Sequence, residues 1–146
     1  MSSILQGGNS KGKGLIRAIL RILLALFYAY AGYAHIANPE PFLHITPDWV
    51  PAPQQVIFWT GIAEIAGAIG LIQPFYLKIR RAAGIGLALY ALCVWPANIH
   101  HFAMDMGSAN GGLGLGYHIP RMIAQPVLIW LALWTGGATN WPMRRR

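Results

Sequence analysis

A single carboxylate stands in the middle of an apolar stretch rich in small residues, residues 59–71, which reads WTGIAEIAGAIGL. If this stretch crosses a bilayer, an unpaired charge on Glu64 costs at least about 2.5–3.5 kcal/mol. Counted from Gln54, Glu64 lies roughly 15 Å along a helix. A proton, a charged partner or a ligand must therefore neutralise this side chain.

Arg121 is the natural partner for Glu64, because it opens the last apolar segment and its long side chain can point inward toward Gln125. A guanidinium also suits a carboxylate better than an ammonium group does. We therefore expect an Arg121–Glu64 pair. Three interpretations stay open: a pair that only fixes helix packing, a polar pocket open to the outside, or a protonated, hydrogen-bonded Glu64.

The five histidines raise the question of a metal or haem site. Adjacent His100 and His101 cannot both face one site on a regular helix, which weakens the metal interpretation. A site made of His35, one of these two, His118 and Asp105 can still be drawn. We predict no bound metal, with His100, His118 and Asp105 as weak candidates. Haem is disfavoured because no histidine pair has a clear membrane depth.

Composition points to a membrane protein, because only 10% of the 146 residues are charged and 55% are hydrophobic. An ordinary soluble domain carries roughly 25% charged residues. The net charge of +7 resides in short clusters between apolar runs, whereas nucleic-acid binding needs a continuous basic face. The one cysteine, Cys93, excludes an internal disulfide and a Cys-x-x-Cys redox pair. We expect it to be a buried apolar residue.

Four apolar runs are long enough to cross a bilayer as helices, and they are too continuously apolar for barrel strands. The prediction is an all-α membrane protein with a four-transmembrane-helix bundle over residues 14–137, a disordered tail over 1–13 and a basic tail over 138–146. A cleaved signal peptide is an alternative for the first run, but that run is longer than a signal core. The predicted spans are residues 15–37, 54–73, 82–101 and 119–136.

Two connecting segments have distinctive compositions. Residues 38–53 contain five prolines and several large apolar residues. Proline removes a backbone donor, so we expect neither helix nor strand here, but a stiff loop in the interface or folded over the bundle as a lid. Residues 103–117 are glycine-rich without matching a phosphate-binding motif, and we expect a flexible connection.

The basic residues predict the orientation. Ten of the eleven lie on one side of an even number of spans, and only Arg121 lies on the other. Both termini are therefore expected to be cytoplasmic. The histidines and the carboxylates outside the spans then fall on the outer side.

Small residues recur at spacings of three and four in the first three spans, which favours close helix packing. These stripes would turn Glu64, His35 and Asn98 toward the interior. With two residues of the last span they form the predicted site, a polar pocket within the membrane that opens outward. Its members are Glu64, Arg121, Asn98, Gln125 and His35.

Several short motifs over about residues 20–136 resemble the DoxX family of small bacterial membrane proteins, in particular its DoxX-like branch. The motifs, in chain order, are Ala31-Gly32-x-x-His35, Pro39-x-x-Phe42, Pro47-x-Trp49-x-Pro51-Ala52-Pro53, Gly61-x-x-Glu64-x-x-Gly67-x-x-Gly70-Leu71, Pro96-Ala97-Asn98, and Arg121 with Gln125. The resemblance implies a multi-pass protein of the bacterial inner membrane. It makes Glu64, Asn98, Arg121 and His35 the interior site.

Some members of the DoxX family serve as membrane subunits of a thiosulfate:quinone oxidoreductase or of other redox complexes. The resemblance therefore implies an auxiliary redox or quinone-associated subunit; the ligand itself stays open, with quinone as one candidate. Arg121 and Asn98 would donate to carbonyl oxygens while Glu64 handles a proton. Alternatives are a non-enzymatic assembly factor or partner-binding protein with a structural polar cluster, and a small-solute or proton conduit. Expected partners are the bilayer, a redox subunit and a second copy of the chain, but no nucleic acid.

Overall fold

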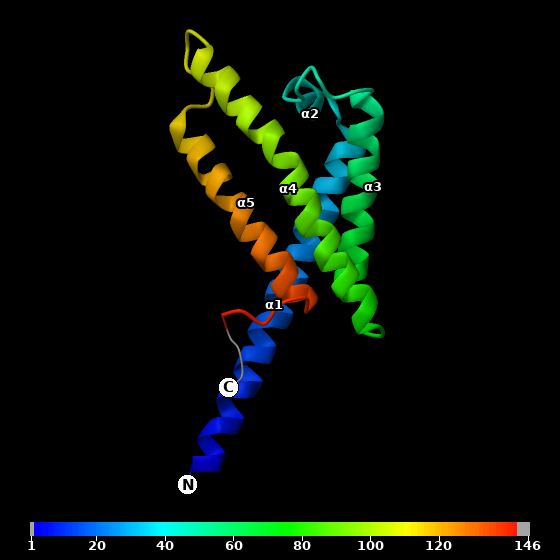
Figure 1. Ribbon diagram of the computed structural model, residues 1–146, viewed down its shortest axis with the longest axis vertical. Coiled ribbons are helices and arrows are strands. Elements are labelled where there is room, and N and C mark those ends of the chain that lie inside the picture. Colours follow the sequence, from blue (N-terminus) through cyan, green and yellow to red (C-terminus); the bar gives the residue numbers. More distant parts are fainter. Residues whose placement is uncertain (1, 143–146) are drawn as a thin grey trace.

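The computed structural model describes residues 2–142, with side-chain burial described from residue 12 onward, and contains helices but no strand over that range. Over this range the chain forms four long helices and one short one, arranged as in Figure 1. Their bounds are α1 Ser2–Ala37, α2 Glu40–His44, α3 Pro53–Ile72, α4 Leu77–Gly107 and α5 Leu115–Gly136.

Three of these helices are long and apolar enough to cross a membrane: Gly12–Ala37 within α1, Pro53–Ile72 and Leu77–Gly107. Over residues 2–142 the structure is all-helical, as expected, and three of its helices have the length and composition of membrane spans. The fourth long helix, α5, has 22 residues but is not among those three. Three of the four predicted spans are therefore supported, and the fourth is not.

Several helix boundaries differ from those predicted. Helix α1 begins at Ser2, within the segment expected to be a disordered tail; no proline interrupts residues 2–13, so a helix can form there. Helix α4 continues past residue 101 to Gly107 and α5 begins at Leu115, so the glycine-rich connection shrinks to residues 108–114. Residues 143–146, which include the three arginines of the predicted basic tail, lie outside the described range.

The proline-rich segment contains a helix that we did not expect. Helix α2 has Pro39 at its N-cap and Pro41 in its first turn, where the missing amide hydrogen has no partner to lose. Backbone bonds from Phe42 and Leu43 to the Pro39 carbonyl oxygen close this single turn. The prolines thus start a helix here, and Pro47, Pro51 and Pro53 then limit its length.

The long helices pack as two pairs, α1 with α3 and α4 with α5. Glycines allow the closest approaches, between Gly32 and Gly61 in the first pair and between Gly84 and Gly136 in the second. In Figure 1 the two pairs meet near the Gly136 end and diverge toward the end that carries α2. The apolar core lies where all four meet: Leu24, Ala25, Tyr28, Ala68, Leu71, Leu87, Ala88 and Ala132.

The contact between Gly32 and Gly61 determines how far α1 and α3 are shifted relative to each other along their axes. Gly32 lies five residues before the end of α1, whereas Gly61 lies eight residues after the start of α3. Helix α3 therefore extends beyond the end of α1 by about one turn. Helix α2 and residues 45–52 lie beyond the C-terminal end of α1, in the space that this offset leaves (Figure 1).

Substituting Gly32 with Ala should destabilise the fold by about 1–3 kcal/mol, as overpacking does. The added Cβ would lie 2.5 Å from the Gly61 carbonyl oxygen and 2.8 Å from Ile65. Thermal unfolding in detergent measures the effect, and Gly86→Ala is the control because nothing lies within 4 Å of its Cβ position. Equal melting temperatures for the two variants would contradict the packing described here.

Candidate functional site

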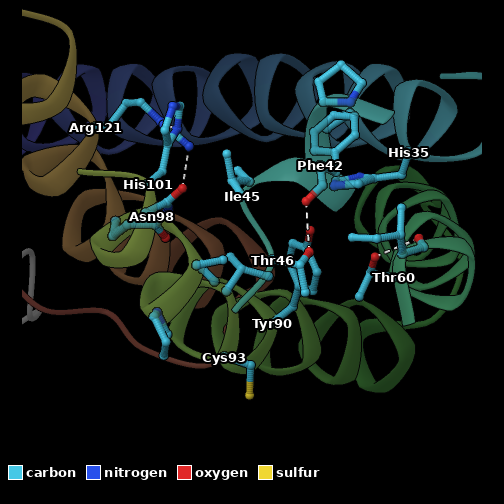
Figure 2. A pocket seen from close by; sticks show the side chains of 18 of the residues that line it. His35, Phe42, Ile45, Thr46, Thr60, Tyr90, Cys93, Asn98, His101 and Arg121 are labelled. Carbon is cyan, nitrogen blue, oxygen red and sulfur yellow. Dashed lines mark hydrogen bonds between the residues drawn. The ribbon is translucent and has the colours of Figure 1, made fainter. Parts of the chain in front are cut away.

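A cavity of about 770 Å³ lies between the two helix pairs, below α2 and the segment that follows it. Its walls come from all five helices, and most of them are apolar. In Figure 2, Arg121, His101 and Asn98 lie together at one side. His35, Phe42 and Thr60 lie at the other side, with Thr46 and Tyr90 between the two groups.

Glu64 is buried at 3% exposure and hydrogen-bonded to His35, with 2.6 Å between Glu64 Oε2 and His35 Nδ1. The pair forms because the close approach of the two antiparallel helices places His35 beside Gly61 and Glu64 beside Gly32, so that the two side chains meet across the contact. Phe42 of α2 covers the imidazole, with 3.9 Å between the ring centroids. The hydrogen bond to His35 thus gives a partner inside the protein to a carboxylate that would be costly alone in a membrane.

The expected Arg121–Glu64 pair is wrong. Arg121 instead donates to Asn98 Oδ1 through one terminal nitrogen and to His101 Nδ1, 2.9 Å away, through the other. Its guanidinium also lies 5.0 Å from the Tyr117 ring centroid. The reason is helix pairing: Arg121 belongs to α5, which packs on α4, whereas Glu64 faces α1.

Two buried polar atoms in the cavity wall have no hydrogen-bond partner among the described residues. They are the Tyr28 hydroxyl and Gln125 Oε1, on residues that are 2% and 8% exposed. An unsatisfied buried polar group costs about 1–3 kcal/mol. The cavity therefore holds unused hydrogen-bonding capacity as well as apolar surface.

All five residues predicted for the polar pocket line this one cavity: Glu64, Arg121, Asn98, Gln125 and His35. Four of them form two hydrogen-bonded pairs rather than one cluster, Glu64 with His35 and Arg121 with Asn98, and Gln125 Oε1 has no partner among the described residues. Whether they bind a ligand remains a prediction.

The sequence reasoning missed two contributors on α4, His101 as a partner of Arg121 and Tyr90 in the cavity wall. The signal was helical spacing around Asn98. His101 follows Asn98 by three residues, and Tyr90 precedes it by about two turns, so all three share one face of the helix.

A second polar cluster closes the connection between α4 and α5. His118 Nε2 lies 2.8 Å from Asp105 Oδ2, and His101 Nε2 lies 3.6 Å from the same oxygen. The backbone N–H of Leu113 also donates to it, at 2.8 Å. A Cβ at Gly112 would overlap the Asp105 carboxylate, so this tight turn requires glycine.

The ligand atoms of His101, Asp105 and His118 all lie within 4.8 Å of one another, so these three residues could hold a metal ion. The structure groups His101 here rather than the predicted His100, because residues 101 and 105 are one helical turn apart. Arg121 can only donate, so His101 Nδ1 accepts and its Nε2 carries the proton that faces Asp105. That proton would have to leave before a metal could bind. The expected absence of a metal remains a prediction.

Cys93 is exposed, so the expectation of a buried cysteine is wrong. The buried face of α4 carries Ala88, Ala91 and Asn98, and Cys93 lies on another side of the helix at 100° per residue. Figure 2 shows its sulfur pointing away from the other labelled side chains.

A family model described as "Domain of unknown function (DUF8561)" matches residues 24–136, well over half of the chain. The chain belongs to this family. The expected membership of the DoxX family is therefore wrong: the quoted motifs are short pieces rich in glycine, proline and alanine, which membrane helix pairs of different families can share. No curated protein matches, and no solved structure matches.

Replacing Asp105 with Ala should lower the free energy of unfolding by about 1–3 kcal/mol, because it leaves His118 and the Leu113 N–H without their acceptor. Thermal unfolding in detergent is the measurement. Asp48→Ala removes the same charge from an exposed position and is the control. Elemental analysis of the wild-type sample tests the absence of a metal. An Asp105→Ala melting temperature equal to that of Asp48→Ala would contradict this role.

Proposed function

We propose that the cavity binds a lipid-soluble small molecule with an apolar body and a head that bears carbonyl-type oxygens, a quinone being the representative of this class. The observation that carries this proposal is the pair of unpartnered buried polar atoms, on Tyr28 and Gln125, in the wall of one large apolar cavity. A protein that used this space only for packing would gain stability by filling it with apolar side chains.

The size and lining of the cavity support an apolar ligand body. Its volume of about 770 Å³ falls within the roughly 300–1,000 Å³ typical of small-molecule sites. Side chains such as Phe27, Ile57, Val94 and Leu128 supply most of the wall. A ligand that reaches the protein from the bilayer matches this surface.

The end of the cavity at which Arg121 lies offers hydrogen-bond donors for the polar head of the ligand. Arg121 is held by Asn98 and His101, and a guanidinium has five N–H donors, so donors remain for an oxygen of the ligand. The side-chain amide of Gln125 lies one turn deeper on α5 and can donate or accept. Carbonyl oxygens of a ligand accept hydrogen bonds and would therefore match the donors of Arg121 and Gln125.

The Glu64–His35 pair supplies a group at the other end that can give or take a proton. It lies in the wall of the same cavity and is shielded by Phe42. Proton exchange with a bound head group would be compatible with an auxiliary redox or quinone-associated subunit. The redox step itself, its partner subunit and any self-association remain predictions from the sequence, as does the absence of nucleic acid.

We further propose that α5 is a fourth span and that both termini are cytoplasmic. Helix α5 packs along α4 through Gly84 and Gly136, and its outer face exposes Ile119, Ile123 and Val127, as a lipid-facing helix would. The basic residues gather at the Gly136 end, which favours the cytoplasmic side for that end. The cavity would then open toward the outside, and the bacterial inner membrane remains the expected location.

A purely structural role is the second candidate, and one observation favours it. Glu64 and His35 already satisfy each other across the tight contact between α1 and α3. In an assembly factor or partner-binding protein, this bond would only hold the two helices together. The unpartnered atoms on Tyr28 and Gln125 would then have no use.

The test measures decylubiquinone binding and thermal stability on the same detergent-purified samples. Gln125→Leu should weaken binding about tenfold, because it removes a polar contact to the ligand. The melting temperature of the ligand-free protein should stay equal or rise, since the unsatisfied amide oxygen is gone. Gln55→Leu, at an exposed position on α3, is the control and should change neither quantity.

Glu64→Gln separates the two candidates, because glutamine keeps a hydrogen bond to His35 but cannot take up a proton. Lost binding with a retained melting temperature supports the pocket. A lower melting temperature, with no decylubiquinone binding by the wild-type protein, supports the structural role and rejects the proposed ligand class.

A further inference from the structure

Four arginines converge at the end of the molecule opposite to the large cavity. Arg17 and Arg21 come from α1, and Arg80 and Arg81 come from the first turns of α4. They surround a smaller hollow of about 200 Å³, several times the roughly 30 Å³ that one water occupies in the liquid. The rest of its wall is Leu77, Thr135, Gly137 and Asn140.

This end has no side-chain carboxylate to balance the arginines. The four acidic residues of the chain are Glu40, Asp48, Glu64 and Asp105. Two lie in α2 and the segment after it, one pairs with His35, and one lies at the far end of α4. Within residues 2–142, the side chains of Arg21, Arg80 and Arg81 make no hydrogen bond or ion pair to another residue. Like charges brought together in this way repel each other, so a bound anion would stabilise the arrangement.

Arg17 differs from the other three because its guanidinium already holds α5 in place. It donates to the carbonyl oxygens of Trp134, at 2.7 Å, and Thr139, at 3.3 Å, and to Asn140 Oδ1, at 3.1 Å. The guanidinium also lies 5.2 Å from the Trp134 ring centroid. These contacts hold the C-terminal end of α5 and the residues that follow it, and they fix one wall of the hollow.

Asn140 and the start of α4 add further donors beside the hollow. Asn140 Oδ1 is used by Arg17, which leaves the amide N–H groups of Asn140 to donate. The backbone N–H groups of the first turn of α4, from Leu77 onward, have no partner within their own helix and carry the positive end of the helix dipole. Gly137 lies beside both Arg17 and Arg81, since a Cβ there would be 3.7 Å from Arg17 Nη2 and 3.8 Å from Arg81 Cγ.

We propose that this hollow, the arginine site, binds a phosphate group, either that of an anionic lipid head group or that of a free phosphate. Arginine is the preferred partner of phosphate because its planar fork donates two parallel hydrogen bonds. Basic pockets between membrane helices on the cytoplasmic side are suited to anionic head groups. Binding would link α1, α4 and α5 at the end where the two helix pairs meet, and it is independent of the ligand in the large cavity.

The test titrates the full-length protein in detergent with three probes at constant ionic strength: dihexanoylphosphatidylglycerol, dihexanoylphosphatidylcholine and inorganic phosphate. Binding is read from the rise in melting temperature and from calorimetry. The double variant Arg21→Ala/Arg80→Ala should weaken binding of the anionic probe about tenfold or more, because charge-assisted hydrogen bonds are lost. Arg17 is left intact because it holds α5.

The matched control is Lys13→Ala/Lys78→Ala, which removes two positive charges from exposed positions of α1 and α4 that do not line the arginine site. It should bind the anionic probe like the wild-type protein. Without ligand, the arginine variant should melt at the same or a higher temperature than wild type, since charge repulsion is relieved.

Binding of inorganic phosphate alone identifies a soluble phosphate as the ligand, and binding of phosphatidylglycerol alone identifies a lipid head group; both outcomes support the site. No binding of any probe overturns the proposal, as does equal binding of the two lipids. Equal weakening in the lysine control would also overturn it, because the effect would then come from the net charge rather than from the site.

Discussion

The hydrogen bond between His35 and Glu64 is the contact on which the α1–α3 pair depends. It places a carboxylate in a low-dielectric interior without leaving it unpaired. It can form only because Gly32 and Gly61 let the two backbones approach. The close approach of Gly32 and Gly61 also sets how far α3 extends past the end of α1. It thereby sets the position of α2, whose Phe42 covers the His35 imidazole.

The two ends of the bundle differ in packing and in charge. Near Gly136 the helix pairs meet, and Arg17 connects α1 to the end of α5. Toward α2 the pairs diverge and leave the large cavity between them. All four carboxylates belong to the part of the chain around or beyond this cavity, and the arginine site has none. One molecule thus offers a largely apolar cavity with polar ends and a separate site rich in donors.

Membership of a family of unknown function assigns no activity, so the chemistry rests on the geometry alone. Asn98, Arg121 and His101 form a continuous chain of hydrogen bonds. The nearby Asp105 ties His118 to the turn before α5. The orientation of Arg121 therefore depends on how α4 and α5 are joined, which links the short turn of residues 108–114 to the wall of the cavity.

The sequence by itself determined that the chain is helical, with three segments long and apolar enough to cross a membrane, because hydropathy is a local property that each segment carries wherever it packs. It also identified five of the polar residues that line the cavity, since helical spacing turns Glu64, His35 and Asn98 toward the interior. Only the tertiary structure decided their partners. Glu64 meets His35 rather than Arg121 because backbone contacts between glycines select which helices pair and at what height. The convergence of Arg17, Arg21, Arg80 and Arg81 likewise depends on bringing together helices that are distant in sequence.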